Sequence, residues 1–188
     1  MIFPDELRAR ATALLDAYRE AGLRIVTAES CTGGLVAGLL TDIAGSSSVV
    51  ERGFVTYSNE AKSDCLGVPP AILAAHGAVS EATARAMAVG ALGASRADVS
   101  IAVTGIAGPG GGSADKPVGL VHLACARRGG AVRHLEMRYG DLGRSMVRLR
   151  TVADALGLLE GAVQPDPAAM RSVTPGREAG PGPRTAGV

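Results

Sequence analysis

Short runs rich in β-branched and aliphatic residues alternate with stretches of helical apolar spacing, and this order is the strongest constraint on the fold. The predicted strands cover residues 24–28, 49–57, 99–104, 118–126 and 131–138. The predicted helices cover residues 4–21, 35–43, 59–66, 71–75, 80–95 and 141–163. Strands that alternate with helices and then pair as a hairpin predict an α/β fold, here a three-layer α/β/α sandwich with a mixed sheet.

The chain of 188 residues divides into a patterned part and an unpatterned part. Residues 1–163 carry all the predicted helices and strands, and their length fits one domain with a core of its own. Residues 164–188 are rich in Pro, Gly, Arg, Ala and Ser without apolar periodicity. We therefore expect one domain over 1–163, followed by a disordered tail that has no catalytic part.

Composition argues against several classes of protein. The net charge of +1 gives no basic surface for nucleic acid or for an anionic membrane. The apolar stretches are too short to span a bilayer, and the amphipathic N-terminus with its acidic residues is unlike a signal peptide. We expect a chain that acts without nucleic acid and without a membrane. The oligomeric state stays open, a homo-oligomer included.

Cysteines and histidines argue against disulfides and zinc. The three cysteines, an odd number without a CxxC pair, are Cys31, Cys65 and Cys125. Such spacing is typical of a reducing compartment, so we expect a cytoplasmic protein. The histidines are also widely separated in sequence, which argues against a zinc site; they are His76, His122 and His134.

The segment 27–34, TAESCTGG, places two candidate nucleophiles at the end of a predicted strand. Ser30 is either a plain N-cap of the following helix or a nucleophile at the carboxyl edge of the sheet, where α/β proteins bind ligands. The amides from Cys31 and Thr32 onwards can point at an oxyanion, and the glycine pair that starts at Gly33 leaves room for substrate. A thiol at a helix N-terminus has a lowered pKa, but no motif supplies Cys31 with a base, so a buried packing role is the simpler interpretation.

The segment 57–62, YSNEAK, follows the second predicted strand and supplies a candidate base. Only two of the 19 basic residues are lysines, Lys62 and Lys116, and an amine can lose a proton that a guanidinium keeps. If the strands run parallel, Tyr57 and Lys62 approach Ser30, with Lys62 as general base and Tyr57 as proton relay. A strand-end tyrosine beside a solvated helix lysine is the alternative.

A glycine loop, residues 105–117, follows the strongly apolar strand that ends at Thr104. The loop matches neither the P-loop nor the Rossmann pattern, but amides free of side chains suit a phosphate or a ribose, and Thr104 adds a hydroxyl. The glycines that we expect to contact substrate are Gly105, Gly108 and Gly110. A flexible surface loop is the alternative. Arg144 and Arg148, one turn apart on the last helix, suit a phosphate or an ordinary solvated helix face.

Five segments in chain order closely resemble the CinA carboxy-terminal domain family: TAESCTGG, GFVTYSNEAKSDCLGV, HGAVSEATARAMAVGA, VTGIAGPGGGSADKPVGLVHLA and GDLGRSMVR. The resemblance runs from the first helix to about residue 160 and does not depend on one short motif. It implies an α/β/α sandwich and a metal-free serine–lysine amidase that needs no cofactor. The implied substrate is a small pyridine nucleotide, nicotinamide mononucleotide, which is hydrolysed to nicotinic acid mononucleotide and ammonia.

The resemblance also implies roles for single residues. Ser30 matches the nucleophile of the family, Tyr57 and Lys62 match its activating pair, and Thr104 and Arg144 match positions associated with activity. Long members carry a further amino-terminal domain that resembles molybdopterin-binding proteins, which we expect to be missing because residue 1 begins the amidase domain. Some members are associated only with competence or DNA damage, so a nucleotide-binding or interaction module without turnover is the alternative.

Overall fold

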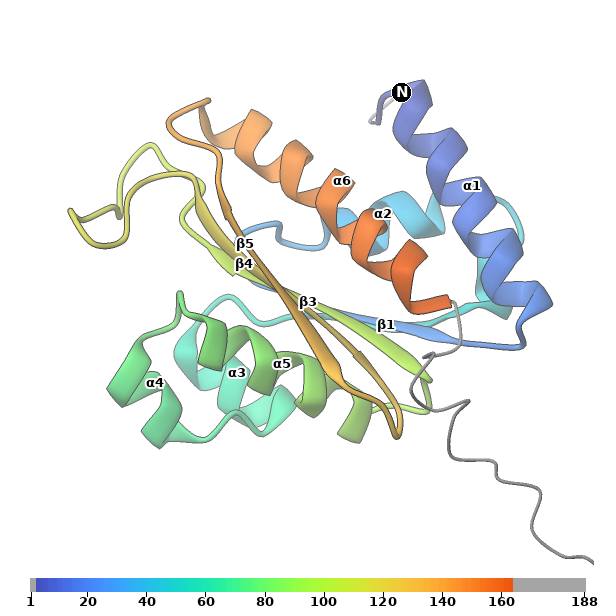
Figure 1. Cartoon of the computed structure of the whole chain (residues 1–188), viewed down its shortest axis with the longest axis horizontal. Helices are drawn as coiled ribbons and strands as arrows, with labels where there is room; N and C mark the ends of the chain where they lie inside the picture. The colour runs from blue at the N-terminus through green and yellow to red at the C-terminus, as the bar shows by residue number, and fades with distance from the viewer. Residues whose placement is uncertain (1–2, 164–188) are drawn as a thin grey trace, which may run out of the picture.

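Five strands form one mixed sheet that has helices on both faces (Figure 1). The computed structural model describes residues 3–163, and the predicted tail, 164–188, lies outside them. The strands are β1 (Ile25–Glu29), β2 (Val50–Val55), β3 (Val99–Gly105), β4 (Leu120–Arg127) and β5 (Val132–Arg138). They lie in the order β2-β1-β3-β4-β5. β1 is parallel to β2 and β3, whereas β4 is antiparallel to β3 and β5.

The helices form the two outer layers of the predicted α/β/α sandwich, which is thereby confirmed. They are α1 (Asp5–Glu20), α2 (Leu35–Thr41), α3 (Asn59–Leu66), α4 (Pro70–His76), α5 (Glu81–Gly93) and α6 (Arg144–Val163), with a short 3-10 turn, η1 (Ser46–Ser48). Figure 1 shows α1, α2 and α6 on one face of the sheet and α3, α4 and α5 on the other. None of the helices within residues 3–163 is long and apolar enough to cross a membrane.

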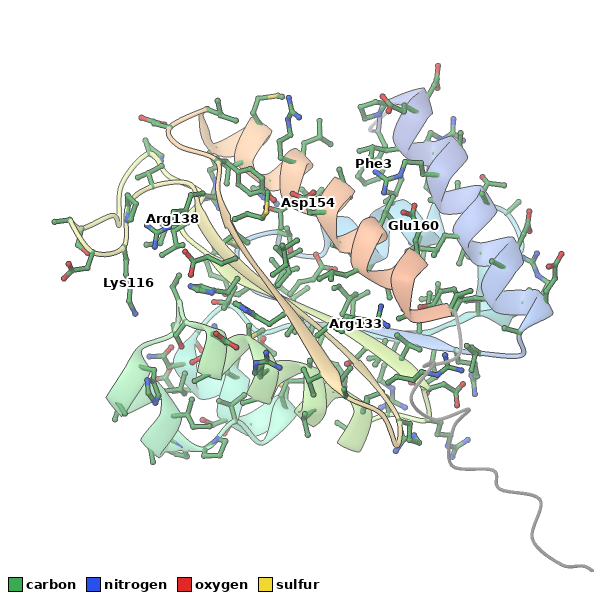
Figure 2. All side chains as sticks on the ribbon, in the orientation of Figure 1. Phe3, Lys116, Arg133, Arg138, Asp154 and Glu160 are labelled. Carbon is green, nitrogen blue, oxygen red and sulfur yellow. The ribbon has the colours of Figure 1, made fainter. Side chains whose placement is uncertain are left out.

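The layer of α1, α2 and α6 is packed mainly by large aliphatic side chains. Burying one such side chain contributes about 1.5–3 kcal/mol, so this layer supplies most of the hydrophobic stabilisation. Helices α1 and α6 are also joined by polar contacts: the buried Tyr18 hydroxyl donates to the Leu159 carbonyl at 2.9 Å, and Arg10 pairs with Glu160, which Figure 2 labels on α6.

Small residues fill the opposite layer, where α5 lies against the sheet. Ala88 of α5 belongs to the same buried cluster as Ala102 and Ala124 of the sheet, and the Ser100 hydroxyl donates to the Ala88 carbonyl at 2.7 Å. Helix α3 packs equally closely on α5 at Gly90, where an added Cβ would lie 1.9 Å from the Leu66 carbonyl oxygen. Because Gly90 has no side chain, α3 can pack this closely against α5.

Two of the element boundaries that differ from the sequence prediction bear on the site. Helix α6 begins at Arg144 rather than at residue 141, because Gly140 and Gly143 have φ angles of 73° and 79°, outside the helical region. Strand β2 ends at Val55, two residues early, and Ser58 caps α3 by accepting the Ala61 amide at 3.0 Å. This early turn brings the start of α3 close to the end of β1.

Candidate active site

Three parallel strands end at the same edge of the sheet, and the predicted site residues follow these ends. Glu29, the last residue of β1, is in register with Val55 of β2 and with Val103 of β3. Ser30 therefore lies between the β2–α3 connection and the residues that lead from β3 into the glycine loop. Carboxyl ends of parallel strands are where α/β sheets bind ligands.

Ser30 and Lys62 are brought together at this edge. The Lys62 Nζ atom lies 3.1 Å from the Ser30 Oγ atom, although the two residues come from different elements. Lys62 is only 1% exposed and Ser30 is 8% exposed. The alternative of a solvated helix lysine is therefore wrong, and the Ser30–Lys62 pair has the geometry of a nucleophile and its base.

Burial, rather than hydrogen bonding, favours a neutral Lys62 amine. Besides Ser30, the Nζ atom lies 2.9 Å from the Thr56 carbonyl oxygen and 3.4 Å from the Ser58 carbonyl oxygen. An ammonium donates to both carbonyls and to Ser30 Oγ, whereas a neutral amine donates to the two carbonyls and has a lone pair available for the Ser30 hydroxyl. Burial lowers the pKa of Lys62 below its ordinary value, with Glu60 opposing this effect, and so favours the form that can accept a proton.

The Ser30 turn, residues 30–34, connects β1 to α2, and Ser30 does not cap that helix. The cap position belongs to Gly34, which has a φ of 94°, a conformation that glycine adopts without strain. The N-cap interpretation of Ser30 is therefore wrong. The fully buried Glu29 carboxylate serves the helix instead, accepting from the amides of Gly34 at 3.0 Å, Val36 at 3.0 Å and Ala37 at 2.9 Å.

Two amides of the Ser30 turn remain without a protein acceptor. The Ser30 amide donates to the Val103 carbonyl, and the Gly33 amide donates to the Ser30 carbonyl. Within residues 3–163 the amides of Cys31 and Thr32 donate to no other residue. Adjacent backbone amides beside a nucleophile are typical donors to an oxyanion.

Cys31 is buried beside Ser30 and has the properties of a packing residue. Its side chain belongs to the hydrophobic core and is 5% exposed. Burial raises the pKa of its thiol to about 12, so the prediction of a lowered pKa is wrong. At neutral pH the thiol is protonated and is a poor nucleophile.

Tyr57 and Arg144 meet across the pocket mouth. The exposed Tyr57 hydroxyl accepts from Arg144 Nη2 at 2.9 Å, and Arg144 Nη1 donates to the Gly108 carbonyl at 3.1 Å. Arg144 thus joins the end of β2 to the glycine loop. In the described part of the chain Tyr57 makes no hydrogen bond to Ser30 or Lys62, and its relay role stays a prediction.

One pocket of about 260 Å³ is lined by all the predicted site residues except Thr32 and Gly33. Thr104 is buried at its wall and donates its hydroxyl to the Ala78 carbonyl at 2.7 Å. Among the described residues the amides of Gly108 and Gly110 donate to no protein acceptor, so they are free to bind an anion. The glycine loop therefore belongs to the pocket and is not an unrelated surface loop.

Thr32 and Gly33 lie behind the pocket, against α6. Thr32 is fully buried, and Arg148 Nη2 donates to its carbonyl at 2.7 Å. A Cβ on Gly33 would lie 3.3 Å from the same Arg148 nitrogen. Gly33 therefore leaves room for Arg148 rather than for substrate, and Arg148 holds the Ser30 turn rather than facing the pocket as a phosphate ligand.

Other reactive side chains lie outside the pocket. His122 and His134 stack with their ring centroids 5.3 Å apart, since β4 pairs with β5, so separation in sequence was a poor guide to their distance. No three His, Cys, Asp or Glu side chains within residues 3–163 are arranged to hold a metal ion.

Of the two remaining cysteines, Cys125 is buried and Cys65 is exposed on α3. Lys116, labelled in Figure 2, donates to the His76 carbonyl at 2.7 Å and ties the glycine loop to the end of α4.

Sequence reasoning missed three contributions to the site. Glu29 and Arg148 hold the Ser30 turn, and the Thr56 carbonyl orients the Lys62 amine. An acidic residue at the end of an otherwise apolar buried strand was a signal for Glu29. The other two contacts depend on tertiary structure, which local patterns do not report.

Comparison with known proteins identifies the family of the chain. The profile of the CinA C-terminal domain matches residues 7–163. The chain belongs to the CinA C-terminal domain family. A solved member of this CinA superfamily, the competence/damage inducible protein CihA of Agrobacterium tumefaciens, is 59% identical, with a TM-score of 0.85 over 86% of this chain and 98% of its own.

Other members of the CinA family include a named enzyme. Nicotinamide-nucleotide amidohydrolase PncC of Escherichia coli K12 is 51% identical over 155 residues, which cover 82% of this chain and 93% of PncC. A CinA-like protein of Geobacter sulfurreducens is 59% identical over 148 residues, but these make up 35% of that longer protein. A CinA superfamily protein of Klebsiella pneumoniae has a TM-score of 0.79 at 36% identity, covering 84% of this chain and 97% of its own.

Proposed function

We propose that the chain hydrolyses the carboxamide of nicotinamide mononucleotide and releases nicotinic acid mononucleotide and ammonia. The observation that carries the proposal is the buried Ser30–Lys62 pair, with 3.1 Å between Oγ and Nζ, at the wall of a pocket. Identity of 51% to nicotinamide-nucleotide amidohydrolase PncC over most of both chains supports the choice of substrate.

In the first step the Ser30 oxygen attacks the carboxamide carbon while its proton passes to the Lys62 amine. The Cys31 amide, in a residue that lines the pocket, donates to the oxyanion that forms. The Lys62 ammonium then protonates the leaving nitrogen, so ammonia departs and an ester to Ser30 remains. A water molecule attacks this ester, gives its proton to the Lys62 amine, and the proton returns to Ser30 as the acid leaves.

The other pocket residues suit the nucleotide part of the substrate. The Arg144 guanidinium and the free amides of Gly108 and Gly110 offer positive charge and donors to a phosphate. In this proposal Tyr57 holds Arg144 in place, and Thr104 fixes the opposite wall through Ala78. The three free cysteines support a cytoplasmic location for the enzyme.

The test is release of ammonia from nicotinamide mononucleotide by the purified chain, with the Ser30→Ala variant as control. Turnover by the wild type and none by the variant is the expected result. Calorimetric binding of the nucleotide without ammonia release would contradict the proposal and indicate a binding module instead.

A further inference from the structure

Glu29 has a buried carboxylate and is adjacent to the nucleophile Ser30. The Glu29 side chain takes no direct part in the proposed reaction. Its Oε2 atom accepts the amides of Gly34 and Val36, and its Oε1 atom accepts the amide of Ala37. Glu29 is 0% exposed, so these three bonds form away from water. Charge-assisted bonds of this kind are among the stronger hydrogen bonds in proteins.

The main chain of Glu29 is fixed as firmly as its side chain. Its carbonyl accepts the Thr56 amide at 2.8 Å, and the next amide, that of Ser30, donates to the Val103 carbonyl at 2.9 Å. The Glu29–Ser30 peptide is therefore held between β2 and β3, while the carboxylate holds the start of α2. These contacts fix both ends of the Ser30 turn.

These contacts determine which backbone amides of the Ser30 turn already have a protein acceptor. Glu29 engages the first amides of α2, and the Gly33 amide bonds within the turn. In the described part of the chain only Cys31 and Thr32 of the Ser30 turn keep amides free of a protein acceptor. The start of α2 thus has its own anion and does not compete for the oxyanion or the phosphate of a substrate.

We infer that Glu29 is a positioning residue for amide hydrolysis: its carboxylate holds the Ser30 turn so that the free amide of Cys31 points at the oxyanion. The inference rests on the proposed function. Arg148 restrains the same turn from α6 through the Thr32 carbonyl, at 2.7 Å. Glu29 and Arg148 contact different residues of the turn, and neither lines the pocket.

The test is the Glu29→Gln variant, because glutamine keeps the shape and loses one acceptor oxygen. Its NH₂ group faces backbone donors, so at least one of the three amide bonds is lost and the turn shifts. Since removing one oxyanion donor lowers kcat by about 10²–10³, a displaced donor is expected to lower kcat by about tenfold or more. KM for nicotinamide mononucleotide is expected to stay within about twofold, because Glu29 does not contact the substrate.

A control separates positioning from plain loss of stability. Tyr18→Phe removes a buried hydrogen bond between α1 and α6, far from the sheet edge that carries Ser30, and should lower the melting temperature while leaving kcat unchanged. All rates are taken per folded protein, well below the melting temperature of each variant. If Glu29→Gln does not fold, Glu29→Asp serves, because its shorter arm reaches the α2 amides only when the turn moves, so kcat again falls at constant KM.

The possible failures are distinguishable. No ammonia from the wild-type chain would overturn the proposed function and this inference with it. Ammonia from the wild type, together with a wild-type kcat in the Glu29 variant, would overturn the inference alone. A raised KM at unchanged kcat would also overturn it, because it would assign Glu29 to substrate binding.

Discussion

Replacement of Lys62 tests the proposed chemistry most directly. Lys62→Met keeps an unbranched side chain of similar length in a position that is 1% exposed, but it removes the amine that lies 3.1 Å from Ser30 Oγ. Lys62→Arg keeps a positive charge, but a guanidinium stays protonated and cannot accept the serine proton. Both variants should therefore lose the base.

The expected losses of kcat and of folding stability follow from the contacts of the Lys62 amine. General-base catalysis contributes about 10²–10⁴ in rate, so kcat should fall by at least this factor. At about 1.36 kcal/mol per tenfold, this loss corresponds to about 3–5 kcal/mol of barrier. Lys62→Met also leaves the carbonyl of the buried Thr56 without its 2.9 Å donor, which should cost about 1–3 kcal/mol of folding free energy.

The assay is continuous detection of ammonia from nicotinamide mononucleotide across a range of pH. In the wild type kcat/KM should rise with pH through the pKa of Lys62, because the protonated amine cannot act as a base, and burial sets this pKa below the ordinary value of about 10.4. This limb of the profile should disappear in both variants. Lys116→Arg is the matched control, because its guanidinium can still donate to the His76 carbonyl.

One outcome would refute the reasoning about Lys62. If Lys62→Arg retained most of the wild-type kcat while KM rose, the side chain would act as a cation that attracts the phosphate. The Ser30 hydroxyl would then need another base.

Three further predictions concern the nucleophile, the phosphate and the packing of α3. Ser30→Ala should abolish ammonia release and Cys31→Ala should keep most of it, because burial raises the pKa of the Cys31 thiol to about 12; a covalent substrate adduct mapped to Cys31 would contradict this. Arg144→Met should raise KM by about tenfold or more at nearly constant kcat, since it removes a charged hydrogen-bond donor from the pocket; a loss confined to kcat would assign Arg144 to the chemical step. Gly90→Ala should lower the free energy of unfolding by about 1–3 kcal/mol because its Cβ would overlap the Leu66 carbonyl, whereas Gly93→Ala, with nothing within 4 Å, should be neutral or stabilising; equal melting temperatures would argue against close packing of α3 on α5.

Much of the fold was predictable because its signals are local. β-branched runs, helical spacing and the glycines at turns identify the elements, and the order of these elements restricts the topology. The errors occur where tertiary contacts override local pattern. Ser30 has the sequence of an N-cap, yet Gly34 holds the cap position and the buried Glu29 side chain accepts the amides at the start of α2, those of Gly34, Val36 and Ala37.

The site was predictable to the extent that its residues follow strand ends. Ser30, Lys62 and Thr104 converge because β1, β2 and β3 are parallel and end at one edge. The direction of individual side chains was not predictable in this way. Tyr57 was expected beside Lys62 and instead contacts Arg144, an orientation set by the early end of β2.

The distribution of the cysteines makes helix α3 accessible to site-selective labelling. Cys31 and Cys125 are buried and burial raises both thiol pKa values to about 12, whereas Cys65 is exposed. A maleimide fluorophore should therefore attach to Cys65 in the native protein without any substitution of the other two cysteines. Because Cys65 lies one turn beyond Lys62 on α3, the emission of that fluorophore would report movement of the base-bearing helix when nucleotide enters the pocket.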